Sequence, residues 1–210
     1  MRNPDLYVYL IRIPPLLFAL TIHEFAHAWA AYRCGDPTAK DLGRLTFNPL
    51  AHLDPLGTIC LLFAPFGWAK PVPVNPYNFR HPRRDDILVS VAGVAANLAT
   101  AIIAAGALRL ALHLGFQPAG SPAAEAAADM ALVLVQISVG LMLFNLIPIP
   151  PLDGSHVLRD LLPYEAARFY DQVAPFTSFL LVVLVVSHGF DVILGWPHHQ
   201  IVGLLLGPAS

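Results

Sequence analysis

The sequence predicts an all-α integral membrane protein with about four transmembrane helices and a re-entrant loop or short β segment. Hydrophobic residues make up 56% of the 210 residues, and charged residues only 12%, which is about half the usual share in soluble domains. The mean hydropathy is +0.61. With a net charge of −2, this composition excludes a disordered chain, a nucleic-acid-binding protein and an ordinary cytosolic enzyme.

The apolar stretches predict where the chain crosses the bilayer, since a crossing needs about 20 apolar residues. We expect one domain over residues 1–210, with membrane helices over residues 6–32, 87–114, 130–147 and 173–195. The first of these is expected to be a retained helix, not a signal peptide, because no small-residue cleavage site follows it. Pro14 and Pro15 should kink this helix or shift its start.

The remaining segments predict loops and one surface helix. Residues 34–55 and 117–129 are rich in turn-forming or small residues and are expected to be loops. Residues 56–69 are apolar but short and contain Pro65, which favours a re-entrant segment over a full crossing. Residues 70–79 alternate Pro and Val and predict extended structure, so the re-entrant or extended region covers about 45–79. The charged residues of 158–172 predict a surface helix.

The basic residues predict the orientation. If the first helix runs from outside to inside, residues 33–86 and 148–172 are cytoplasmic, and they hold nine of the twelve Lys and Arg residues. We therefore expect a multi-pass protein of the cell or inner membrane, with these segments in the cytoplasm.

The sequence His23-Glu24-Phe25-Ala26-His27 is the strongest chemical signal in the chain. Residues four apart lie on one face of a helix, so the two imidazoles can bind one metal ion. Glu24 is then close enough to act as general base, which is the pattern of zinc-protease helices. Ionisable groups in a membrane helix are costly, at about 3 kcal/mol each on insertion scales, and a bound metal would compensate that cost.

A catalytic zinc ion needs a third protein ligand, and Asp153 is the best candidate. Three prolines, at 148, 150 and 151, break the third apolar stretch just before it. Irregular backbone at membrane depth is tolerated where it is buried in protein or lines a wet cavity. Asp153 should thus lie at the depth of His23 and His27, and Gly154 permits a tight turn after it.

Taken together, these motifs resemble the site-two protease family of intramembrane zinc metalloproteases. The resemblance rests on HEFAH at 23–27, FNPLAHLDPLGT at 47–58, GWAKPVPVNP at 67–76, AGVAANL at 92–98 and the N-x2-P-x4-DG pattern of 145–154. It runs through most of residues 15–160. Many members carry a PDZ or CBS domain, and because this chain has no room for either, we expect a compact form of the family.

The resemblance implies one Zn²⁺ per chain, bound by His23, His27 and Asp153, with Glu24 as catalytic base. Asn145 would polarise the substrate carbonyl or stabilise the oxyanion. The implied activity is an endopeptidase that works in the lipid bilayer and cuts transmembrane proteins in or beside their membrane segments. We expect its site to open toward the cytoplasm, because the polar loop at 34–55 and the proline-rich break at 148–151 give water access there. The resemblance also implies that the 67–76 segment is extended near the site, where an unwound substrate strand could pair.

Several alternatives stay open from the sequence. A soluble-type zinc peptidase, anchored in the membrane, could use Glu165 as third ligand. A membrane zinc-binding protein or pseudo-protease scaffold could keep the site without turnover. Asn97 has either an active-site or helix-packing role or makes a plain polar contact between helices, and His52 is expected to order its loop. The sequence does not decide whether the chain forms a homo-oligomer.

Overall fold

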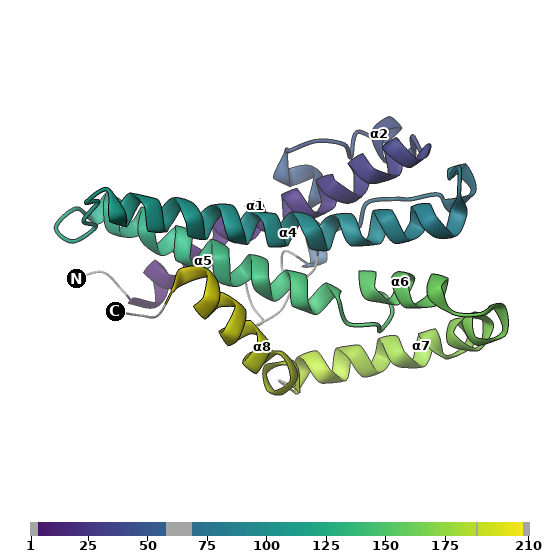
Figure 1. Ribbon diagram of the computed structural model, residues 1–210. Coiled ribbons are helices and arrows are strands. Elements are labelled where there is room, and N and C mark those ends of the chain that lie inside the picture. Colours follow the sequence, from purple (N-terminus) through teal and green to yellow (C-terminus); the bar gives the residue numbers. More distant parts are fainter. Residues whose placement is uncertain (1–3, 58–68, 188, 208–210) are drawn as a thin grey trace.

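Three long helices pack side by side and form the body of the protein (Figure 1). The computed structural model describes residues 4–57, 69–187 and 189–207. The long helices are α1 (Pro4–Cys34), α4 (Pro82–His113) and α5 (Pro122–Asn145). All three are apolar and long enough to cross a membrane, and the number is four if the bent pair over 164–177 and 179–185 forms one span. The predicted all-α multi-pass architecture is confirmed.

The long helices extend beyond the ranges expected from apolarity alone. α1 continues through Pro14 and Pro15 to Cys34. α4 begins at Pro82, five residues before the apolar stretch. α5 begins at Pro122, so most of the expected 117–129 loop is helical. Ser121 caps this helix by accepting a hydrogen bond from the Ala124 N–H. Pro122 occupies a first-turn position where no backbone donor is needed. The alanines that follow favour the helix, because alanine has the highest helix propensity.

The C-terminal part of the chain differs more from what the sequence predicts. The predicted surface helix over 158–172 is wrong, because the chain breaks there into α6 (Asp153–Leu161) and α7 (Tyr164–Val186). Pro163 disfavours helical backbone at Leu162, which is extended, and so ends the first helix. The span expected over 173–195 falls on the end of α7 and the first part of α8 (Gly189–Leu206), which packs against α5.

The region between α1 and α4 contains short elements and extended backbone. These are α2 (Thr38–Asp41), η1 (Pro49–His52) and η2 (Pro76–Asn78). Leu53 and Ala69 form an isolated antiparallel bridge, and the Lys70 N–H donates to the His52 carbonyl at 2.9 Å. Backbone without helix then runs to Asn75, as expected for the Pro/Val alternation. The predicted re-entrant segment over 56–69 lies almost wholly outside the described residues.

Small side chains allow the long helices to approach closely. Between α4 and α5 the buried core consists of Val94, Ala101, Ala105, Val135, Val139 and Met142. Between α1 and α4 it consists of Ala30, Ala31 and Val89, together with Phe79. In a membrane, packing of this kind replaces the hydrophobic effect as the main attraction between helices. It places the C-terminal half of α1 against the N-terminal half of α4, where the candidate site lies.

A buried carboxylate holds the extended segment beside α1. Asp36, fully buried just after α1, accepts hydrogen bonds from the Asn75 N–H (2.7 Å), the Asn78 side chain (2.8 Å) and the Thr38 N–H (3.1 Å). Burial alone would raise the pKa of Asp36, but these donors outweigh it and lower the pKa below its ordinary value.

Candidate metal centre and active site

Two imidazoles and one carboxylate converge between α1 and α6. His23 and His27 lie one turn apart on α1, and their Nε2 atoms are 3.0 Å from each other. Asp153, the first residue of α6, places Oδ2 at 3.4 Å from Nε2 of His23 and 3.3 Å from Nε2 of His27. Both histidines are buried. The structure thus brings together the three ligands expected from the sequence.

The geometry of this group suits a zinc ion. Tetrahedral zinc with bonds of 2.0–2.2 Å holds neighbouring ligand atoms about 3.3–3.6 Å apart. The two distances from Asp153 fall in this range, and the 3.0 Å between the two imidazole nitrogens is 0.3 Å shorter than its lower end. Oδ2 of Asp153 is buried and has no hydrogen-bond partner among the described residues. A cation between the three atoms would satisfy that oxygen and the facing nitrogen lone pairs. Among the described residues this is the one group of three or more His, Cys, Asp or Glu side chains suited to a metal ion, and Glu165 is not in it.

Asp153 reaches this position because the chain folds back on itself after α5. α5 ends at Asn145, and α6 starts again at Asp153 after the proline-rich turn. Gly154 lies so close to the preceding turn that a Cβ would lie 2.8 Å from the Ile147 carbonyl oxygen and would overlap the Leu146 carbonyl. Glycine is required here for close approach of two backbone segments, and not for a left-handed conformation.

Glu24 is buried beside the histidines, and its position is fixed by the extended segment. Its Oε2 accepts a hydrogen bond from the Val72 N–H at 2.9 Å. Pro71 and Pro73 lack an N–H, so Val72 supplies the sole donor of this three-residue stretch. Sequence reasoning missed this contact, because a backbone donor leaves no side-chain signal.

These groups line a common cavity with a volume of about 460 Å³. Besides the three metal-ligand candidates, Glu24 and Asn145 contribute to its wall. The Asn145 side-chain nitrogen donates one hydrogen bond to the Leu141 carbonyl at 3.0 Å, which leaves its second N–H for another acceptor. All five site residues predicted from the sequence therefore face one cavity.

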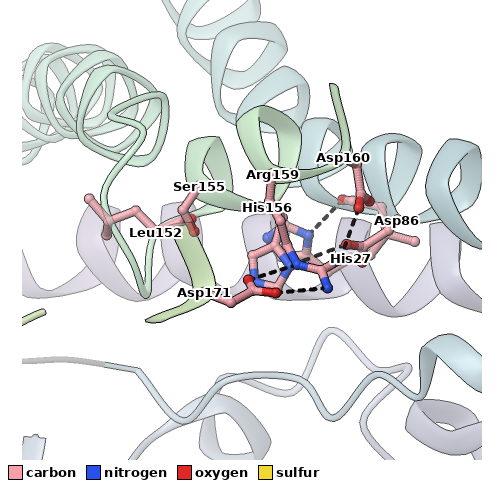
Figure 2. Close-up of polar contacts among 9 residues, drawn as sticks. His27, Asp86, Leu152, Ser155, His156, Arg159, Asp160 and Asp171 are labelled. Atoms are coloured by element: carbon pink, nitrogen blue, oxygen red, sulfur yellow. Dashed lines mark hydrogen bonds and ion pairs between the residues drawn. The ribbon is translucent and has the colours of Figure 1, made fainter. Parts of the chain in front are cut away.

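A polar network joins α6 to both neighbouring helices (Figure 2). Nδ1 of His156 lies 3.2 Å from Oδ2 of Asp86 on α4, and Arg159 pairs with Asp171 on α7 at 2.9 Å and with Asp160 at 3.1 Å. The hydrogen bond and charge of Asp86 raise the pKa of His156. Burial and a hydrogen bond to Asp86 raise the pKa of Asp160. This network fixes the helix that begins with the third ligand candidate.

Other histidines lie apart from the metal-ligand group. His52 is buried in η1, where its Nε2 donates to the Thr46 carbonyl at 2.9 Å, and burial lowers its pKa. This contact orders the loop, as the sequence led us to expect. His198 donates to the Gln136 carbonyl at 2.9 Å and so joins α8 to α5.

Known proteins with similar sequences show which family the chain belongs to. Residues 112–187 match the family described as Peptidase family M50. A Bacillus subtilis protein named "Putative zinc metalloprotease YwhC" is 42% identical over 183 residues, which cover 87% of this chain and 82% of that protein. The chain belongs to peptidase family M50. This is the site-2 protease family that the sequence motifs resemble, so the predicted family is confirmed.

Two further relatives of this M50 peptidase share the name "Putative zinc metalloprotease Rip2". The Mycolicibacterium smegmatis protein is 32% identical over 184 residues, covering 86% of this chain and 68% of the relative. The Mycobacterium tuberculosis protein is 34% identical over 195 residues, covering 90% and 70%. No solved structure is significantly similar to the chain. Family, relatives and the three-ligand group confirm the predicted enzyme class, a zinc metalloendopeptidase in a multi-pass membrane protein.

Proposed function

We propose that this M50 peptidase hydrolyses peptide bonds in or next to the transmembrane segments of membrane-protein substrates, using His23, His27 and Asp153 as zinc ligands. The observation that carries the proposal is the position of this group. Its two histidines lie on α1, which is apolar and long enough to cross the membrane, and the group shares a cavity with a buried glutamate. A peptide bond cut there must itself lie within or at the edge of the bilayer.

The chain's residues suit hydrolysis. Zinc bound at this group supplies a Lewis acid that polarises the scissile carbonyl and increases the acidity of water. Glu24, held by Val72 at one oxygen, takes a proton from the attacking water with the other, while the water oxygen bonds to the carbonyl carbon. The second N–H of Asn145 stabilises the oxyanion. The carbon–nitrogen bond then breaks, and Glu24 returns its proton to the leaving amine.

The extended segment provides a surface for an unwound substrate. A helical amide is already hydrogen-bonded, so a substrate helix must open before its peptide bond can be attacked. Between residues 70 and 73 the N–H of Lys70 binds His52 and that of Val72 binds Glu24, and the other two residues are prolines. The Lys70 carbonyl already accepts a hydrogen bond from the Arg44 side chain at 2.6 Å. This edge therefore offers the carbonyl oxygens of residues 71–73, and we expect the substrate strand to donate its N–H groups to them.

We further propose that the cavity opens toward the cytoplasm, on the strength of the nine basic residues in 33–86 and 148–172. The test replaces both native cysteines with alanine and introduces Thr46→Cys. A membrane-impermeant thiol reagent should label this cysteine in inside-out vesicles and not in intact cells. Labelling in intact cells instead would reverse the orientation.

The catalytic proposal is tested by comparing membrane proteomes from cells that express wild type, Glu24→Gln or Glu165→Gln. Loss of the base should slow cleavage by about 100-fold or more, so that uncut substrates accumulate with Glu24→Gln. Glu165 is exposed on α7, and its glutamine variant should behave as wild type. Identical fragments in all three proteomes would instead support the alternative, a zinc-binding scaffold without turnover.

A further inference from the structure

One face of α4 lies directly against the two ligand histidines. Val89, Gly93 and Asn97 are spaced four residues apart, so they line up along this face. The Val89 carbonyl accepts a hydrogen bond from Nδ1 of His27 at 2.8 Å, and the Asn97 side chain lies 3.1 Å from Nδ1 of His23. Each ligand histidine thus meets α4 through the ring nitrogen that does not face the metal-ligand group.

Gly93 allows this close approach. A Cβ at this position would lie 2.7 Å from Cε1 of both His23 and His27, and closer still to Nε2 of His27. Real Cβ atoms essentially never approach other atoms so closely. Both rings therefore rest on the backbone of α4, and a side chain larger than hydrogen would displace them.

The chemistry of Asn97 defines what it does there. Its side chain is fully buried, and among the described residues its Oδ1 has no hydrogen-bond partner while its Nδ2 faces His23. A neutral histidine that binds metal through Nε2 carries its proton on Nδ1 and needs an acceptor there. Two donors facing each other do not bond. Half a turn of the amide places Oδ1 opposite Nδ1 and satisfies both groups.

We propose that Asn97 is a positioning residue of the metal centre, which accepts the Nδ1–H of His23 through Oδ1 as the Val89 carbonyl accepts that of His27. The backbone of Gly93 also hydrogen-bonds to the His23 ring. Together with this contact, the two acceptors keep Nε2 of each ring free to bind the metal and fix the ring orientations. The inference rests on the ligand set of the proposed function. Replacing such a partner typically weakens metal binding by about 10–100-fold.

The test measures zinc dissociation constants of the purified full-length chain by competition with a chromophoric chelator. Asn97→Leu keeps the size of the side chain and removes the acceptor, so its affinity should fall by about 10–100-fold. Asn97→Asp keeps an acceptor oxygen and should stay within about threefold of wild type. The Co²⁺-substituted Asp variant should also retain the wild-type absorption spectrum. Should the Leu variant not be recovered folded, Asn97→Ala replaces it in the comparison.

A role in packing alone predicts the opposite order. Leucine would then be tolerated in the helix interface, while a buried aspartate would be harmful. Zinc affinity of the Leu variant equal to that of wild type, or an Asp variant weaker than the Leu variant, would overturn the proposal. Gly93→Ala should likewise weaken zinc binding, whereas Gly106→Ala on the same helix, with no atom within 4 Å of its Cβ, should not.

Two more variants separate this inference from the ligand assignment. His23→Ala and Asp153→Ala each remove a ligand and should abolish stoichiometric zinc binding. Should either variant bind zinc as tightly as wild type, the ligand set is wrong and the inference falls with it. Should both lose zinc while Asn97→Leu keeps wild-type affinity, the ligand set stands and only the role of Asn97 fails.

Discussion

Replacing Gly154 with alanine should destroy the metal centre without touching a ligand. The new Cβ would lie 2.8 Å from the Ile147 carbonyl oxygen and 2.6 Å from the Leu146 carbonyl carbon, where ordinary contacts begin at 3.4 Å. Relief therefore requires α6 to move by at least 0.6 Å from the first atom (3.4 − 2.8) and 0.8 Å from the second (3.4 − 2.6), and further still from the Leu146 carbonyl oxygen, which is the nearest of the three. The obstructing atoms belong to the backbone, so no side-chain rotation removes the clash.

Metal coordination tolerates only small changes in metal–ligand distance, so this movement of α6 should weaken zinc binding. Metal–ligand distances vary by about 0.2 Å in working sites. A shift of α6 three to four times larger carries Asp153, the adjacent residue, out of bonding distance of an ion held by His23 and His27. We expect Gly154→Ala to bind zinc at least about 100-fold more weakly and to lose peptidase activity in parallel.

The assay is metal analysis of the purified protein after dialysis against a zinc buffer, followed by chelator competition. Gly203→Ala is the matched control, since a Cβ there meets no atom within 4 Å. A Gly154→Ala protein that binds one zinc ion with wild-type affinity would refute the reasoning, because it would show that α6 accommodates the methyl group without moving Asp153.

Two further predictions concern the supports of the site. Because Asp86 raises the pKa of His156, its ion pair stabilises the fold fully below about pH 6.5 and less as pH rises through the higher folded-state pKa. The melting-temperature difference between wild type and His156→Gln should thus shrink from pH 5.5 to pH 9, and an equal difference at both pH values would contradict this. Asp36→Asn should lower the free energy of unfolding by about 2 kcal/mol near neutral pH in chemical denaturation, since it weakens hydrogen bonds to a buried charge; exposed Asp41→Asn is the control. The lowered pKa of Asp36 means that this difference is present above about pH 3.8 and vanishes as pH falls through the folded-state pKa, so persistence at lower pH would argue against it.

Much of the architecture and chemistry could be predicted from local patterns. Apolar stretches identified the three long helices, and the four-residue spacing of His23 and His27 placed both imidazoles on one face. The ends of the helices were harder to predict. Ser121 and Pro122 are good start signals, but the small residues after them also suit a loop. Pro163 is an equally visible break, which the charged pattern around it obscured.

The tertiary contacts at the site could not be predicted from local sequence patterns. The approach of Asp153 to the histidines depends on how α6 packs against α4, and from the sequence it rested on the broken helix and the family resemblance. Val72 acts through its backbone N–H, so its side chain gives no sign of that role. Gly93 is one small residue among many in an apolar helix, and only the position of the rings reveals why it must be glycine.

The separation of the proposed ligands along the chain has a consequence for biosynthesis. His27 and Asp153 are 126 residues apart (153 − 27). At about 5–20 residues per second, a ribosome needs roughly 6–25 s to extend the chain from one to the other. During that interval the nascent protein holds an incomplete metal group with no α6 to close it. With the proposed ligand set, proteolytic competence would arise only after α6 is made, so an unfinished chain would not attack other proteins being inserted nearby.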